Sequence, residues 1–99
     1  MKVTVEQIGG FVGYLRKMVD TSELAPEEGA RFRSLVEQSN LLGRKGEQHL
    51  AAGNLPSYTI TIETDQDVYQ VAFDEASKPE SAAPLLRYVQ QRGKPLPPP

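Results

Sequence analysis

The sequence has 99 residues, a net charge of −2 and no cysteine. This length suits one domain with a modest core, and the mixed charges provide no basic face for nucleic acid. Without cysteine the chain has neither a disulfide framework nor thiolate chemistry. No apolar run approaches the roughly 20 residues that a membrane helix needs. We therefore expect a small protein that binds neither nucleic acid nor a membrane.

The first predicted elements are two strands joined by a pair of glycines. Residues 2–7 and 14–19 alternate apolar and polar side chains, as half-buried strands do. Glycine accepts the positive φ that a two-residue hairpin turn needs, so we place the turn at Gly9 and Gly10. This register puts Val3, Val5, Val12, Tyr14 and Met18 on the core side of the sheet, and Ile8, Phe11 and Leu15 on the other side.

The next predicted element is a helix that begins at Pro26. Proline suits the first helical position, and the two glutamates that follow it suit the positive end of the helix dipole. The apolar stripe of this helix consists of Phe32, Leu35 and Val36. Residues 40–56 are rich in glycine and are typical of a long connection, with one helical turn at 47–52.

Two more strands and a second helix complete the chain. Alternation at 58–63 and 69–73 predicts a pair of strands around the polar turn 64–67. Ser81 is the best cap for the last helix, which Gly93 ends.

The element order is therefore ββαββα, which predicts an α+β fold. We expect one domain over residues 1–93, with a four-stranded antiparallel sheet and two helices packed on one face. The proline-rich residues 94–99 are predicted to form a disordered tail. No apolar signal segment precedes the first strand, so we expect a cytoplasmic protein, with export by another route left open.

The sequence offers little for catalysis or for holding a cofactor. His49 is the single histidine, and Glu47 precedes it by two residues. One imidazole without a second ligand or a base makes neither a metal site nor a nucleophilic pair. The acids between 65 and 75 lack the spacing of a calcium loop and are better explained as turn residues. We therefore expect neither an enzyme nor a protein with a cofactor.

The apolar hairpin turn is the feature that points to recognition. Phe11, with Ile8 and Leu15 on the face away from the helices, would form an exposed hydrophobic patch. Such patches on small proteins usually mark contact sites. The same pattern also fits a Phe11 that folds back over the end of the core, and the residues alone leave both arrangements open.

Four stretches together carry a resemblance to a known family. They are GGFVG at 9–13, DTSELAPEE at 20–28, YTITI at 58–62 and VAFDE at 71–75. With these stretches the chain resembles the emfourin family, small proteinaceous inhibitors of thermolysin-like metallopeptidases of the protealysin type. The resemblance implies a bacterial protein, monomeric when free, that inhibits such a peptidase reversibly and tightly. The zinc ion would belong to the peptidase.

The resemblance also implies a partner that favours a bulky apolar side chain just after the scissile bond, which suggests Phe11. We predict that the protease-binding residues are Ile8, Gly9, Gly10, Phe11, Val12, Gly13 and Leu15. Two other routes stay open: the loop 43–56, with Glu47 or His49 reaching the partner's zinc, and strand addition at an edge of the sheet. The competing class is a non-inhibitory adaptor, or a homodimer formed through the free sheet face.

Overall fold

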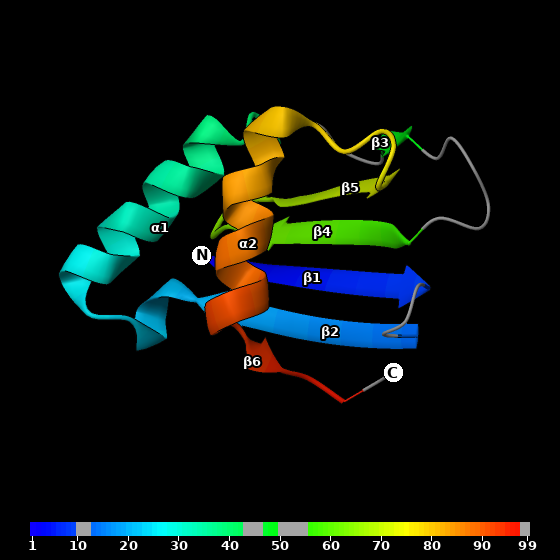
Figure 1. The fold of residues 1–99 in the computed structure, drawn as a ribbon. Coiled ribbons are helices and arrows are strands. Elements are labelled where there is room, and N and C mark those ends of the chain that lie inside the picture. Colours follow the sequence, from blue (N-terminus) through cyan, green and yellow to red (C-terminus); the bar gives the residue numbers. More distant parts are fainter. Residues whose placement is uncertain (10–12, 43–46, 50–55, 98–99) are drawn as a thin grey trace.

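The computed structural model describes residues 1–9, 13–42, 47–49 and 56–97. These residues form one sheet with two helices on one face (Figure 1). The strands are β1 Lys2–Gly9, β2 Gly13–Asp20, β3 Glu47–His49, β4 Ser57–Glu63, β5 Val68–Asp74 and β6 Lys94–Pro95. The helices are α1 Pro26–Gln38 and α2 Ala83–Arg92, each preceded by a short 3₁₀ helix, η1 Thr21–Glu23 and η2 Glu80–Ala82.

The described strands are ordered β3-β5-β4-β1-β2-β6 across the sheet. The four long strands are antiparallel to their neighbours, as predicted. Two short edge strands were not predicted. β3 runs parallel to β5, where we expected a helical turn, and β6 pairs with β2, where we expected a disordered tail. Each lies along the outer edge of a long strand, whose outward backbone groups would otherwise lack a partner in the sheet.

The predicted register of the first hairpin is wrong. Ile8 pairs with Tyr14, three residues beyond its predicted partner Phe11, and Gly9 pairs with Gly13. Both of these glycines have positive φ, 96° at Gly9 and 74° at Gly13. The strands therefore end at a glycine on each side, and the connection contains three residues, 10–12, which lie outside the described part of the chain.

A shift by an odd number of residues exchanges the two faces of β2. Val3 is buried under the helices and pairs with Val19, so Val19 and Leu15 lie on the helix face. Tyr14 and Met18 lie on the opposite, open face together with Ile8. The placement of Tyr14 and Met18 in the core, and of Leu15 on the free face, was therefore wrong.

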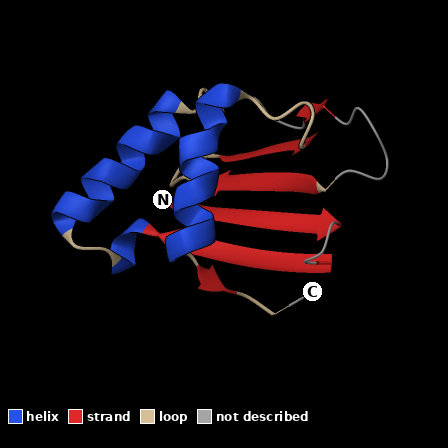
Figure 2. Ribbon diagram, viewed as in Figure 1, coloured by secondary structure: helices blue, strands red, loops and turns tan. Residues whose placement is uncertain are grey.

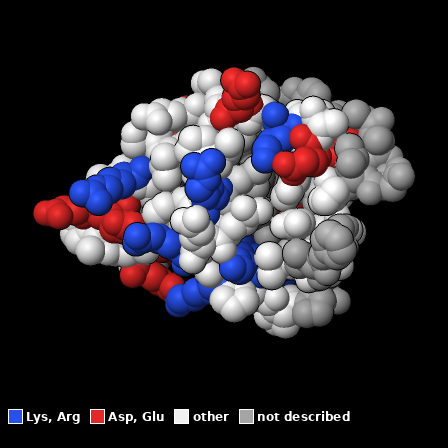
Figure 3. All heavy atoms as spheres, viewed as in Figure 1, with Lys and Arg blue, Asp and Glu red and all other residues white. Residues whose placement is uncertain are grey.

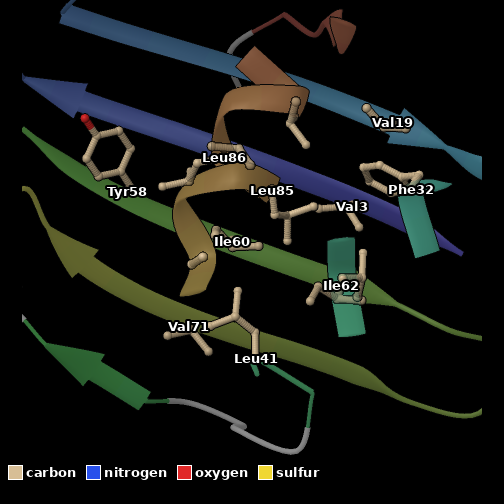
Figure 4. Packing of buried hydrophobic residues seen from close by; sticks show 14 of the residues in the cluster. Val3, Val19, Phe32, Leu41, Tyr58, Ile60, Ile62, Val71, Leu85 and Leu86 are labelled. Atoms are coloured by element: carbon tan, nitrogen blue, oxygen red, sulfur yellow. The ribbon is translucent and has the colours of Figure 1, made fainter. Parts of the chain in front are cut away.

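The core fills the space between the helix face of the sheet and the two helices (Figure 4). Alternate residues of the long strands supply one wall, and the helices supply the other. The ring of Phe32 on α1 packs 5.1 Å from the ring of Tyr88 on α2. The side chains shielded almost completely from solvent include Val3, Phe32, Val36, Leu41, Ile60, Ile62, Val71, Phe73, Leu85 and Val89.

Both helices begin with proline in the first turn and end as the sequence indicates. α1 begins at Pro26, as predicted, and Gly93 caps the end of α2. Ser81 does not cap α2. Its Oγ donates a hydrogen bond of 2.9 Å to the carbonyl of Ser39 and so joins η2 to the end of α1. Within the described residues, no helix is long and apolar enough to cross a membrane.

Candidate functional site

Five strand ends meet at one end of the sheet, which we call the loop end. β1 ends there at Gly9, β2 begins at Gly13, β3 ends at His49, β4 begins at Ser57 and β5 ends at Asp74. In Figure 2 the sheet extends at this end, on the right, beyond the part covered by the two helices. On the helix face of this end Tyr58 and Phe73 are buried all the same, whereas Ile8 on the opposite face is exposed.

Both segments that were predicted to bind the partner reach the loop end. The hairpin connection follows Gly9, and the chain that enters β4 arrives at Ser57, which pairs with Ile8. Residues Gly10, Phe11 and Val12, and the side chains of Glu47 and His49, lie outside what the structure describes. The backbone positions of Glu47 and His49 are described, and they pair with Val71 and Phe73 of β5.

Ile8 is the exposed apolar side chain of the described part of the hairpin. It lies on the open face, and 51% of its surface is accessible to solvent. Gly9 and Gly13 flank the turn in left-handed conformations that side chains other than glycine and asparagine rarely adopt. A Cβ atom at Gly13 would have no neighbour within 4 Å, so another protein could approach this backbone closely. Leu15 is half-buried on the helix face and is separate from this surface.

A trio of side chains that sequence reasoning missed fixes the exit of β5 at the loop end. The Tyr58 hydroxyl donates a 2.6 Å hydrogen bond to Glu75, and Lys78 Nζ lies 3.1 Å from the same carboxylate. Burial is the main cause that raises the pKa of Tyr58 to about 12, and the hydrogen bond to Glu75 adds to it. The hydrogen bond from Tyr58, followed by that from Lys78, lowers the pKa of Glu75. The only signal in the sequence was a tyrosine at the start of a buried strand.

The acidic residue at the end of β5 has a structural role. Asp74 is 1% exposed, and its Oδ1 accepts hydrogen bonds from the backbone N–H and the hydroxyl of Ser77, at 2.9 and 2.8 Å. This is turn chemistry, as the sequence indicated for the acids of this region. Among the described residues, no three His, Cys, Asp or Glu side chains group together as metal ligands would.

The open face of the sheet is polar, which differs from the apolar patch that we predicted there. Tyr14 donates a 3.0 Å hydrogen bond to Glu6, and Gln70 donates one of 3.2 Å to Thr61. Lys2 lies 4.0 Å from Glu63. This composition is unlike the apolar face through which a stable homodimer usually forms.

Figure 3 shows the helix side of the molecule, and the open face that carries Ile8 is turned away in this view. Lys, Arg, Asp and Glu side chains are spread over the helices, whereas the described surface at the lower right, towards the hairpin, is largely uncharged.

The described residues form a small α+β domain in which an apolar residue is exposed beside a hairpin turn. A family model described as Emfourin matches residues 5–90, so this chain belongs to the emfourin family. Membership implies inhibition of metallopeptidases, and members of the family are inhibitors and not enzymes. Comparison with curated proteins gave no match, and comparison with solved structures gave none either.

Proposed function

We propose that this protein inhibits thermolysin-like zinc metallopeptidases of the protealysin type, reversibly and tightly, by placing the loop end of its sheet in the active-site cleft. Membership of the emfourin family supports inhibition of a metallopeptidase. The observation that carries the proposed site is the exposure of Ile8 beside the glycine-flanked hairpin connection. The partner contributes the zinc ion.

The physical case for the loop end is that it combines an apolar contact with a rigid support. β1 lies in the middle of the sheet, paired on both sides along its length, so Ile8 is held in place before binding. A pre-organised contact loses less conformational entropy on association than a long flexible loop does. Phe11 remains the side chain that we propose for the peptidase pocket, with Ile8 beside it. Leu15 supports the hairpin from the helix face.

The loop of the second predicted route also reaches the loop end. Because Ser57 pairs with Ile8, the chain that connects β3 to β4 returns to the sheet next to the hairpin. A peptidase that covers the loop end would meet both segments. We therefore propose that the hairpin provides the central contact and that the residues around Glu47 and His49 contribute at its margin.

Titration of a thermolysin-like peptidase with the purified protein, with cleavage of a small peptide substrate as the readout, tests this function. We expect activity to fall in proportion to the inhibitor added and to be lost at about one equivalent, as a tight inhibitor requires. Dilution of the complex should restore activity, because the block is non-covalent. Full activity at a large excess of folded protein, with several peptidases of this type, would contradict the proposal and favour the adaptor function.

A further inference from the structure

Arg16 lies on the open face close to the loop end and has an acidic residue directly opposite it. Its cross-strand neighbour is Glu6 on β1. The Arg16 carbonyl accepts a 2.8 Å hydrogen bond from the N–H of Leu96, so the Arg16 backbone groups point towards β6 and away from β1. Arg16 and Glu6 are therefore a non-hydrogen-bonded antiparallel pair, the kind in which opposite side chains come closest. This arrangement would favour an ion pair.

The ion pair is not formed. The Glu6 carboxylate instead accepts a 3.0 Å hydrogen bond from the hydroxyl of Tyr14. Across the described ranges, Arg16 makes no ion pair, and its Nε is buried without a hydrogen-bond partner. Buried donors on charged groups are rarely left without an acceptor in folded proteins, because their desolvation is then uncompensated. The free protein thus holds a cation with one buried N–H donor, at Nε, that has no acceptor among the described residues.

The surroundings of Arg16 suit a carboxylate from another molecule. Arg16 lines a groove of about 280 Å³ on the open face, together with Thr4, Met18, Thr61 and Leu96. Two carboxylates also line this groove, Glu6 and Glu63, and Glu6 already accepts a hydrogen bond from the Tyr14 hydroxyl. The groove's other cation, Lys2, lies beside Glu63. A guanidinium donates in a planar fork that matches the two oxygens of a carboxylate. The apolar side chains of Met18 and Leu96 would limit the access of water to such a contact.

Arg16 also continues the surface proposed for binding. Ile8 and Tyr14 form a cross-strand pair on the open face, and Arg16 follows Tyr14 by two residues on the same face. We call these three residues the open-face stripe. Tyrosine and arginine are enriched among the residues that dominate binding energy at protein interfaces. The stripe runs from the exposed apolar residue at the loop end to the unpaired cation.

We propose that the interface with the metallopeptidase extends from the loop end along the open-face stripe, and that Arg16 binds a carboxylate side chain on the peptidase surface beside its cleft. This inference rests on the proposed function and adds to it the chemistry of the partner's contact. It concerns a protein side chain on the peptidase, because Arg16 shares the open face with Ile8 and Tyr14 of the same hairpin.

Charge reversal at Arg16, compared with a matched reversal elsewhere, tests this inference. The control is Arg87, an exposed arginine on α2, which covers the other face of the sheet. We expect Arg16→Glu to raise the inhibition constant by about tenfold or more, since it places like charges at the contact. Arg87→Glu should stay within about twofold of the unaltered protein, as expected for a charge outside the interface. Thermal unfolding of each variant verifies that it is folded.

A neutral variant separates a loss of charge from a disturbance of the groove. Arg16→Gln keeps much of the length of the side chain, and its inhibition should depend less on salt concentration than that of the unaltered protein. Equal inhibition by the unaltered protein, Arg16→Glu and Arg87→Glu would overturn this inference and leave the proposed function standing. Failure of the unaltered protein to inhibit any such peptidase would overturn both.

Discussion

Ile8 lies directly opposite Ser57 in the pairing of β1 with β4. This pair brings together the end of the hairpin and the start of the strand that follows the 43–56 connection, although the two residues are far apart in the sequence. Two connections of the chain therefore reach the sheet side by side at the loop end. Substitutions in either connection are expected to affect the same partner and to be non-additive where they are in contact.

The core depends strongly on Phe32. This side chain is fully buried and packs against Tyr88, so Phe32→Ala should lower the free energy of unfolding by about 3–5 kcal/mol. Leu42 is 38% exposed, and Leu42→Ala should change the free energy of unfolding by less than about 0.5 kcal/mol. Urea unfolding followed by circular dichroism measures both. Similar losses for the two variants would contradict the core described above.

Two glycines should respond differently to alanine. At Gly13 the added Cβ meets nothing within 4 Å, so only the positive φ disfavours alanine there. Gly13→Ala should therefore lower the free energy of unfolding by about 1 kcal/mol. At Gly93 the Cβ would lie 2.5 Å from the Val89 carbonyl oxygen, which is backbone and cannot move aside easily. Gly93→Ala should therefore lower the free energy of unfolding by more, about 2 kcal/mol. Chemical denaturation of the two variants tests this order, and the reverse order would refute it.

The bond from Tyr58 to Glu75 predicts a dependence of stability on alkaline pH. The pKa of Tyr58 is raised from 10.0 to about 12 in the folded protein, so the unfolded chain ionises first as the pH rises. The stabilisation of the folded protein by the Tyr58 hydroxyl is complete below pH 10 and is lost as the pH rises through about 12. Tyr58→Phe should lower the free energy of unfolding by about 1.5 kcal/mol near neutral pH.

The difference in stability between Tyr58→Phe and the unaltered protein should therefore shrink above pH 10. Urea titrations of both proteins at neutral and alkaline pH give this difference directly. Glu75→Gln serves as the control, because it keeps the tyrosine and removes the carboxylate that accepts the tyrosine's hydrogen bond. A difference that stays constant across the whole alkaline range would show that Tyr58 does not contribute in this way.

The sequence predicted the elements of the fold better than their register. Alternation in β1, β4 and β5 was clear because an apolar residue occupies every second position over most of each strand, as at Ile60 and Ile62. β2 is different, because Lys17 lies on the helix face and donates a hydrogen bond to the Gln90 carbonyl. With a lysine on the covered face and Met18 on the open one, its pattern fitted either orientation.

The turn could not resolve this ambiguity, because three glycines offered two ways to close it. A two-residue turn at Gly9 and Gly10 was the shortest solution, whereas the protein uses Gly9 and Gly13 as its left-handed positions. For the candidate site, the sequence identified the hairpin and the apolar Ile8. It did not indicate that Tyr14 and Arg16 share the face of Ile8, since that depends on the register.

Contact between the loop end and the peptidase is tested most directly by Ile8→Asp and its control Val68→Asp. Ile8 and Val68 have nearly equal exposure, 51% and 53%, and both lie on the open face, Ile8 at the loop end and Val68 at the opposite end of the sheet. Both variants should fold, and only Ile8→Asp should weaken inhibition of a thermolysin-like peptidase, by about a hundredfold, as expected for a central contact. Equal inhibition constants for the two folded variants would contradict the account.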